Sequence, residues 1–281
     1  MSLFKTIRNA VGLLAAIEVA NLATYLIMRG PKPQNVQIAA HRGGAALAPE
    51  NTPAAFRNAS RLGVKWIEFD IHRTSDGVLI VHHDDTVNRM TNGAGFVKDM
   101  TWEQISSLRL INDEQIMSFA EIVALAREKG LGILPELKST DYYPGMEIQA
   151  LEIVRKANYL EKTIFLSFQW DVLENIKKEE PAAKVAPLYG AYQWDVSTPR
   201  PANAEIVGPM AEMVLINPWM IQQAHADGRQ VWVWFGSLDR PEIYRILVEL
   251  GVDGLIVNDP KAAMRMIDTN SKRNPITKGT V

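Results

Sequence analysis

Acidic, basic and imidazole side chains recur along the first half of the sequence, in types that suit phosphate chemistry. Two histidines, three carboxylates, an arginine and a lysine make up the set: His41, Arg42, Glu68, Asp70, His83, Glu136 and Lys138. The carboxylates could supply hard oxygen ligands to Ca²⁺ or Mg²⁺, and the two cationic side chains could neutralise a phosphate. Histidine, with a reference pKa of about 6.5, suits proton transfer in both directions. The set predicts metal-assisted cleavage of a phosphate ester.

The spacing of the carboxylates supports a shared ion. Glu68 and Asp70 lie two residues apart within the apolar run Trp66–Ile71, so both side chains fall on one face of a predicted strand. A solvated surface pair fits poorly inside such a run. Lys138 follows Glu136 by two positions, which favours phosphate binding over the alternative, a salt bridge at the rim of the site.

Composition limits the class of protein. The 281 residues are 47% hydrophobic and 22% charged, which is typical of one large barrel or two small domains. The net charge of −2 provides no basic field, so we expect no nucleic-acid partner. The absence of cysteine excludes disulfides, thiolate zinc sites and a cysteine nucleophile.

The N-terminal segment, residues 1–33, differs from the rest. Residues 11–28 are mostly apolar and have basic residues on both sides, although Glu18 and Asn21 interrupt them. This length is near the lower limit of about 18 residues for crossing a bilayer. We predict a membrane anchor or an interfacial helix, the alternative being an amphipathic helix packed on the folded domain. If the preceding basic residues stay inside, the catalytic domain lies outside the cytoplasm, in the periplasm or the extracellular space.

Nine apolar runs of strand length follow this segment and alternate with helical patterns over residues 34–281. The runs are Val36–Ala40, Trp66–Ile71, Val78–Val81, Gly132–Leu137, Thr163–Ser167, Val185–Tyr189, Met213–Asn217, Gln230–Phe235 and Gly254–Val257. The helical patterns are Thr52–Leu62, Ser118–Lys129, Glu147–Asn158, Trp170–Glu179, Pro218–Asp227 and Pro241–Gly251. Such alternation predicts βα units and a parallel sheet.

One connection is too short for a parallel crossover. Only Thr74-Ser75-Asp76-Gly77 joins the second run to the third, whereas a crossover needs about a dozen residues. We therefore expect an antiparallel hairpin strand outside the barrel, which leaves the eight strands of a (β/α)₈ TIM barrel. The hairpin would bring His83 beside Glu68 and Asp70. Residues 85–117, which follow it, are predicted to form a substrate lid.

Taken in order, these motifs resemble the glycerophosphodiester phosphodiesterase family, whose barrel is similar to that of phosphatidylinositol-specific phospholipase C. The resemblance rests on His41-Arg42-Gly43, Pro49-Glu50-Asn51-Thr52, Glu68-Phe69-Asp70, His83-Asp84 and Glu136-Leu137-Lys138. It extends more weakly through Ser167-Phe168, the strand Val231–Trp234 and the segment Gly251–Pro260. The sequence departs from the family pattern at Phe235-Gly236 and at Asn258, on the side predicted to bind the alcohol.

The resemblance implies hydrolysis of glycerophosphodiesters to glycerol 3-phosphate and an alcohol, with Ca²⁺ or Mg²⁺ as cofactor. Carried onto this sequence, it implies Glu68, Asp70 and Glu136 as metal ligands, His41 and His83 as the acid/base pair, Arg42 and Lys138 as phosphate ligands, and Glu50 as a residue that shapes the site. Trp234 belongs either to the barrel core or to the wall of the glycerol pocket. Which histidine is the acid is left open, as is the choice between attack by water and attack by the glycerol 2-hydroxyl.

Three alternatives are kept. A lysophospholipase D, which takes a lipid with one acyl chain as substrate, is suggested by the apolar N-terminus. A membrane-tethered binding protein without catalysis is disfavoured because every motif residue is present. Phosphoinositide-type phospholipase chemistry would release a stable cyclic phosphate. Three other histidines, His72, His82 and His225, are expected to have structural or surface roles.

Overall fold

The computed structural model describes residues 19–31, 33, 35–138, 140–190 and 203–273, with side chains as far as residue 267. Within these residues, eight parallel strands close into a barrel, as predicted. The order is β1-β9-β8-β7-β6-β5-β4-β2, and β2 pairs with β1 to close the ring. These strands are β1 (Gln37–Ala40), β2 (Trp66–Arg73), β4 (Gly132–Leu137), β5 (Ile164–Ser167), β6 (Lys184–Tyr189), β7 (Ile206–Pro209), β8 (Gln230–Trp234) and β9 (Gly254–Val257).

The predicted hairpin is confirmed. Strand β3 (Leu79–Val81) pairs antiparallel with the end of β2, with Ile71 opposite Val81. Gly77 in the turn has a φ of 91°, a conformation that favours glycine. The hairpin brings the chain back to the carboxyl end of β2, where the carboxylates lie.

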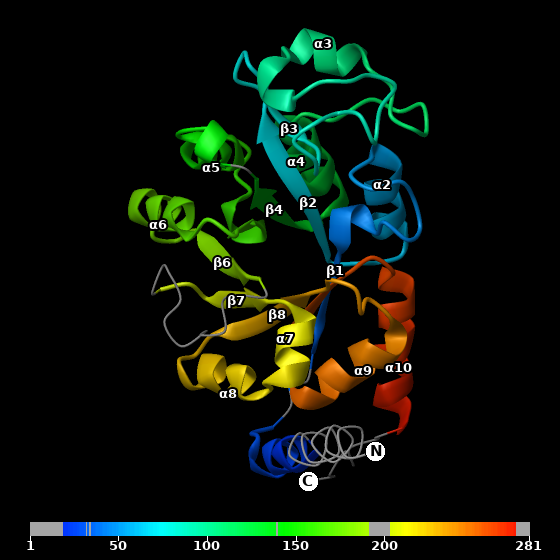
Figure 1. The fold of residues 1–281 in the computed structure, drawn as a ribbon, viewed down its shortest axis with the longest axis vertical. Helices are drawn as coiled ribbons and strands as arrows, with labels where there is room; N and C mark the ends of the chain where they lie inside the picture. Colours follow the sequence, from blue (N-terminus) through cyan, green and yellow to red (C-terminus); the bar gives the residue numbers. More distant parts are fainter. Residues whose placement is uncertain (1–18, 32, 34, 139, 191–202, 274–281) are drawn as a thin grey trace, which may run out of the picture.

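Helices cover the outside of the barrel (Figure 1). They are α2 (Pro53–Arg61), α4 (Phe119–Lys129), α5 (Met146–Lys156), α6 (Trp170–Glu179), α7 (Ala211–Ile216), α8 (Trp219–Ala226), α9 (Pro241–Leu250) and α10 (Pro260–Arg273). Side-chain capping residues mark where two of these helices begin. Thr52 accepts a hydrogen bond from the backbone of Ala55 at the start of α2, and Ser118 forms a capping box with Glu121 at the start of α4.

One predicted strand is wrong. Residues 213–216 belong to α7, with Asn217 as its C-cap, and the seventh barrel strand is β7, earlier in the chain. A short apolar run does not distinguish a strand from a buried helix. Strand β7 was not predicted because glycine and proline are unfavourable inside strands. A Cβ at Gly208 would lie 2.7 Å from Cδ2 of Leu188, so a larger residue there would displace this side chain.

Two tryptophans fill the amino end of the barrel. The rings of Trp66 and Trp232 meet edge to face, with centroids 5.6 Å apart. Glycine is required beside each ring, because a Cβ at Gly132 would lie 2.1 Å from Trp66 and one at Gly254 would lie 2.4 Å from Trp232. This end is therefore closed by side chains, and a cavity can form only toward the carboxyl ends of the strands.

Residues 85–117 form a packed layer over β3. They contain the 3₁₀ turn η2 (Val97–Asp99) and the helix α3 (Trp102–Ser107). Their buried side chains join Ile80 of β3 in one hydrophobic cluster: Val87, Met90, Val97, Ile105, Leu110 and Ile116. This segment, the excursion hereafter, is anchored beside the site by its own core. Its action as a lid stays a prediction.

The described part of the N-terminal segment packs on the barrel. Residues 19–28 are helical, and Figure 1 shows them at the opposite end of the molecule from α3. The Tyr25 hydroxyl donates to the carbonyl of Leu250 at 2.6 Å, and the indole N–H of Trp219 donates to Asn21 at 2.8 Å. Among the described residues, no helix combines the length and the apolar character needed to cross a bilayer. Residues 1–18 lie outside the description, so the anchor predicted for 11–28 stays a prediction.

Candidate active site

A cavity of about 170 Å³ opens at the carboxyl ends of the barrel strands. One part of its wall is charged and comes from the first half of the chain: His41, Arg42, Glu68, His83, Glu136 and Lys138. The other part is apolar and comes mainly from the second half: Leu166, Phe168, Leu188, Trp234, Phe235 and Ile256. Residues predicted from separate motifs therefore meet in one place.

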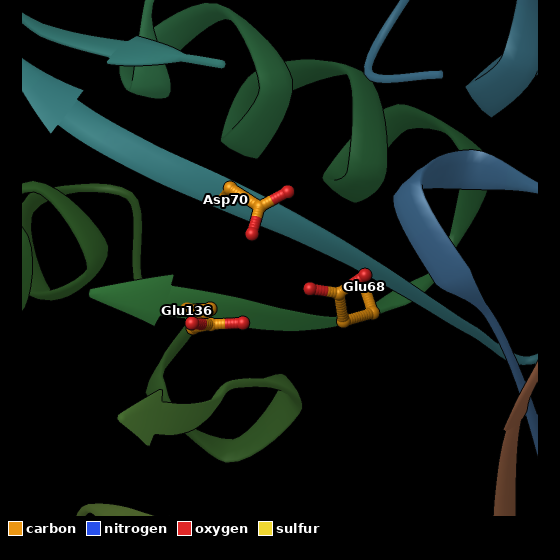
Figure 2. Close-up of side chains that lie close together, drawn as sticks. All are labelled: Glu68, Asp70 and Glu136. Atoms are coloured by element: carbon orange, nitrogen blue, oxygen red, sulfur yellow. The ribbon is translucent and has the colours of Figure 1, made fainter. Parts of the chain in front are cut away.

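Three carboxylates converge beside this cavity (Figure 2). Glu68 and Asp70 project from β2 and Glu136 from β4, and one oxygen of each lies within 4.8 Å of the others. The strand register places Asp70 directly opposite Glu136. All three residues are buried. We call this group the acidic triad.

The electrostatics of the acidic triad fit a bound cation. Burial, together with repulsion from the other carboxylates, raises the pKa of Glu68 well above its usual value, and burial also raises the pKa of Glu136. For Asp70, burial acts in the same direction, but neighbouring cations, Lys138 foremost, lower the pKa. The Oδ1 atom of Asp70 is buried without a hydrogen-bond partner among the described residues. Three oxygen donors with one unsatisfied atom suit Ca²⁺ or Mg²⁺ better than zinc.

His41 follows β1 and begins the 3₁₀ turn η1 (His41–Gly43). Its Nδ1 lies 2.7 Å from Oδ1 of Asn258; because an amide oxygen only accepts, Nδ1 carries the hydrogen. Its Nε2 atom lies 3.9 Å from Oε2 of Glu68 and has no hydrogen bond to the described residues. Burial first, and the Arg42 charge second, lower the pKa of His41, which favours the neutral ring.

Arg42 adopts a left-handed conformation, with a φ of 50°. In this turn its backbone N–H donates to Oε2 of Glu68 at 2.8 Å, while its side chain donates to Oε1 of Glu50 at 2.9 Å. The following Gly43 is required by packing, because a Cβ there would lie 2.8 Å from the Cβ of Ala55 on α2. The turn thus orients a metal-ligand candidate and a phosphate-ligand candidate together.

His83 lies just beyond β3, on the other side of the acidic triad. Its Nδ1 lies 2.7 Å from Oδ1 of Asp84, and its carbonyl accepts from Nε2 of the buried His72 at 3.1 Å. A carboxylate only accepts, so Nδ1 carries the hydrogen and Nε2 is the atom available for chemistry. Both candidate imidazoles are therefore held through Nδ1.

Two cationic side chains lie close to the two oxygens of Asp70. Nζ of Lys138 is 3.7 Å from Oδ1, and Nε of Arg42 is 3.6 Å from Oδ2. Lys138 also pairs with Oε1 of Glu136 at 3.0 Å. Both cations reach the cavity wall, where they could bind an anionic group beside the acidic triad.

The apolar part of the wall contains two aromatic rings in contact. Phe168 and Trp234 meet edge to face with centroids 5.4 Å apart, and the indole N–H of Trp234 donates to the carbonyl of Tyr189 at 3.2 Å. Trp234 also packs on the cluster inside the barrel. The two alternatives for this residue are therefore compatible, since one edge faces the core and another faces the cavity.

Several residues outside the predicted set support the site. Asn51 donates to Oδ2 of Asp70 at 2.9 Å, and Asn258 and Asp84 each hold an imidazole. Arg89 pairs with Asp84 and Glu50. The sequence motifs contain Asn51 and Asp84 and could have identified them as site residues. Their hydrogen-bond partners, Asp70 and His83, are known only from the fold. Glu50 contributes by holding Arg42 and is absent from the cavity wall.

The three remaining histidines have structural contacts, as expected. His72 is enclosed between the Tyr143 hydroxyl and the His83 carbonyl. His82 is bonded to the carbonyl of Thr86 at 2.9 Å. His225 pairs with Asp253 at 2.7 Å, near the amino ends of the strands.

Comparison with known proteins identified a family model and relatives that match this chain. Residues 41–262 match the model of the glycerophosphoryl diester phosphodiesterase family. A glycerophosphodiester phosphodiesterase from Caldanaerobacter subterraneus is 33% identical over 241 residues, which covers 82% of this chain and 97% of the relative.

Solved structures show the same fold. The glycerophosphodiester phosphodiesterase of Agrobacterium tumefaciens has a TM-score of 0.71 at 24% identity, with 82% of this chain and 99% of the other covered. A phosphodiesterase from Oleispira antarctica, solved with its product sn-glycerol-3-phosphate, has a TM-score of 0.73 at 22% identity, with 84% and 97% covered.

Proposed function

Because the chain belongs to the glycerophosphoryl diester phosphodiesterase family and is thus a phosphoric diester hydrolase, we propose that it cleaves glycerophosphodiesters to glycerol 3-phosphate and an alcohol. The observation that carries the proposal is the convergence of three carboxylates, two imidazoles and two cationic side chains on one cavity. The product bound to the Oleispira antarctica relative supports the same choice of substrate.

We further propose that Glu68, Asp70 and Glu136 hold a Ca²⁺ or Mg²⁺ ion. When bound, such an ion acts as a Lewis acid and a template for a phosphoryl oxygen. The raised pKa of Glu68 and the unsatisfied oxygen of Asp70 support this assignment, because a cation would relieve both.

Arg42 and Lys138 would bind the phosphodiester. Arg42 is held in place by Glu50, and Lys138 by Glu136, so each charge is pre-oriented before substrate arrives. Hydrolysis increases the negative charge on the phosphoryl oxygens, and fixed cations that stabilise this charge contribute most in the transition state.

His41 and His83 would transfer the protons. Each ring is fixed through Nδ1 and keeps Nε2 available. One ring, neutral at the start, takes a proton at Nε2 from the attacking hydroxyl, while the other starts as an imidazolium and gives its Nε2 proton to the departing alkoxide. Each such transfer contributes about 10²–10⁴-fold. The attacking hydroxyl is that of water or of the glycerol C2 position. In the second case a cyclic phosphate forms first and water then opens it to glycerol 3-phosphate, so detection of the cyclic intermediate distinguishes the two.

A panel of glycerophosphodiesters tests the proposal. The wild-type protein is expected to release glycerol 3-phosphate and the free alcohol from glycerophosphocholine, to lose this activity in EDTA, and to recover it with Ca²⁺ or Mg²⁺. The variants H41A and H83A should be nearly inactive, whereas H225A, which alters a histidine far from the cavity, should keep full activity. Full activity in metal-free buffer would contradict the metal assignment, and a stable cyclic phosphate product would indicate phospholipase-type chemistry.

The apolar part of the cavity wall favours one second candidate, a lysophospholipase D. Phe168, Trp234 and their neighbours could contact an acyl chain as well as an alcohol. Rates on glycerophosphocholine and lysophosphatidylcholine separate the candidates. We expect the soluble diester to react faster, and a large preference for the acylated substrate would reverse the ranking.

A further inference from the structure

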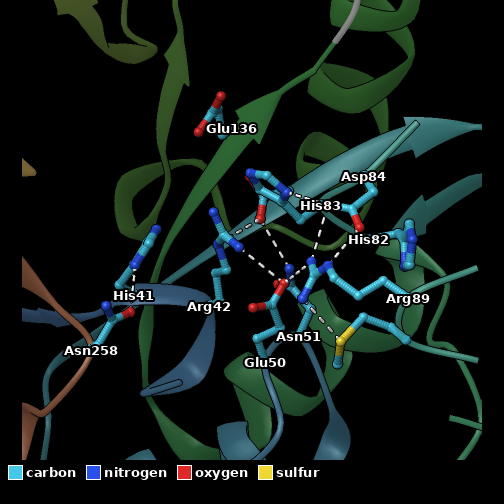
Figure 3. A network of polar contacts seen from close by, with 12 residues as sticks. His41, Arg42, Glu50, Asn51, His82, His83, Asp84, Arg89, Glu136 and Asn258 are labelled. Atoms are coloured by element: carbon cyan, nitrogen blue, oxygen red, sulfur yellow. Dashed lines mark hydrogen bonds and ion pairs between the residues drawn. The ribbon is translucent and has the colours of Figure 1, made fainter. Parts of the chain in front are cut away.

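Arg89 lies in the excursion and contacts two carboxylates at the edge of the site (Figure 3). Its Nε donates to Oδ2 of Asp84 at 2.7 Å and its Nη2 to Oδ1 of the same residue at 3.0 Å. The same Nη2 lies 2.5 Å from Oε1 of Glu50. One guanidinium therefore joins two acidic side chains that come from different loops.

Each of these carboxylates holds a proposed functional residue. Asp84 fixes the imidazole of His83, and Glu50 fixes the guanidinium of Arg42. We propose that Arg89 is a positioning residue for the hydrolysis, one that orients His83 through Asp84 and Arg42 through Glu50. This inference rests on the proposed function, since it assigns Arg89 to that same reaction.

The contacts with Asp84 and Glu50 require the guanidinium of an arginine. A planar fork can bind both oxygens of a carboxylate, whereas a lysine ammonium is a single point of charge. The Arg89 side chain is 48% exposed, and an isolated ion pair at such exposure stabilises a protein little. The arrangement differs because the pair is bidentate and belongs to a network. The hydrogen bond from Arg89 is also the first cause of the lowered pKa of Asp84, which keeps the partner of His83 ionised.

The excursion supports the position of Arg89. On either side in the sequence, Val87 and Met90 are buried in the hydrophobic cluster of the excursion. The backbone N–H of Val87 also bonds to the carbonyl of Gly95 at 3.0 Å. Packing of the excursion thus fixes the backbone from which Arg89 reaches the site, so this segment acts on catalysis through a defined contact.

Kinetics of three variants test the inference. We expect R89A to lower kcat on glycerophosphocholine about 10- to 100-fold, because misplacement of a reacting group by about 1 Å has an effect of that size. KM should rise only a few-fold through Arg42. R89K, which keeps the charge without the fork, should recover only part of kcat. The matched control R109A, an exposed arginine of the same excursion, should stay within two-fold of wild type.

A double-mutant cycle tests whether Arg89 affects kcat through Asp84. If Arg89 acts through Asp84, the variant R89A/D84N should be no slower than the slower single variant, whereas independent effects would multiply. Fully multiplying effects, or an R89A or R89K enzyme with the kcat of R109A, would overturn the inference. R89K decides the question if R89A does not fold.

A second readout does not depend on activity. In nitrogen–proton NMR spectra, the His83 Nδ1–H bonded to Asp84 should be observed in wild type and R109A and be broadened by exchange in R89A. An unchanged His83 signal in R89A would overturn the positioning role even if catalysis were affected. A wild-type protein that hydrolyses no glycerophosphodiester would instead contradict the proposed function, and the NMR comparison would still decide whether Arg89 orients His83.

Discussion

His41 and Asn258 are hydrogen-bonded at 2.7 Å although 217 positions separate them in the sequence. Asn258 is itself fixed, since its backbone N–H donates to Asp239 at 2.8 Å and the Tyr244 hydroxyl donates to the same carboxylate. The contact lies where β1 pairs with β9. Closure of the barrel therefore brings together the imidazole and the amide that orients it.

Removing this amide should impair catalysis without unfolding the barrel. We expect N258A to lower kcat about 10- to 100-fold, because His41 would lose its fixed orientation. Steady-state kinetics and circular dichroism of the same sample check the prediction. An N258A enzyme with wild-type kcat would show that this contact is dispensable.

Replacing the amide by a carboxylate should instead shift the pH profile. In N258D a negative charge would face Nδ1 of His41 and stabilise the protonated ring, so the pKa of His41 should rise. The limb of the kcat/KM profile that belongs to His41 then moves to higher pH. An unmoved profile would mean that His41 does not set either limb.

The aromatic wall should affect substrate binding more than chemistry. Trp234 contacts the cavity through its ring, away from the acidic triad, so W234A should raise KM about 10-fold and leave kcat within a few-fold. W219A, which alters a tryptophan of α8 outside this cavity, is the control. A large fall in kcat with KM unchanged would place Trp234 in the chemical step.

Much of the barrel could be predicted from the sequence because turn residues clearly mark where its strands begin and end. The short connection Thr74–Gly77 left a hairpin as the only possibility for β3, and the structure confirms it. The seventh strand could not be predicted, since Gly208 and Pro209 are poor strand formers on their own. Gly208 lies close to the Leu188 side chain, a contact that exists only once neighbouring strands pair.

The site residues, too, were only partly predictable from the sequence. Glu68 and Asp70 were predictable as a pair because the spacing of two residues on one strand determines their common face. Asn258 was not, because 217 positions separate it from His41, and Arg89 was not, because it joins the nearby Asp84 to Glu50, which lies 39 positions away. Their roles depend on barrel closure and on the packing of the excursion. The sequence therefore predicts the groups that react better than the groups that hold them.

His72 predicts a pH-dependent stability. Burial lowers its pKa to about 4 in the folded protein, against about 6.5 when unfolded. Between these values the unfolded chain binds a proton that the folded protein does not, so this contribution is fully present above pH 6.5 and is lost as the pH falls toward 4. Between pH 7.5 and 5.0 the loss should be about 2 kcal/mol.

Comparison with H72Q isolates this contribution, because glutamine does not titrate and the other groups are shared. The difference in unfolding free energy between wild type and H72Q, measured by urea denaturation, should shrink by about 2 kcal/mol from pH 7.5 to 5.0. A difference independent of pH would show that His72 does not titrate in this window.

The most direct test of the account is to locate the cation by anomalous X-ray diffraction. Manganese accepts the same oxygen ligands as magnesium and scatters anomalously. In crystals of wild-type protein grown with saturating Mn²⁺, we predict one strong peak among Glu68, Asp70 and Glu136, within about 2.0–2.6 Å of an oxygen from each. The rings of His41 and His83 should flank it. A manganese ion bound elsewhere, or a Glu136 carboxylate turned away from the other two, would contradict the account.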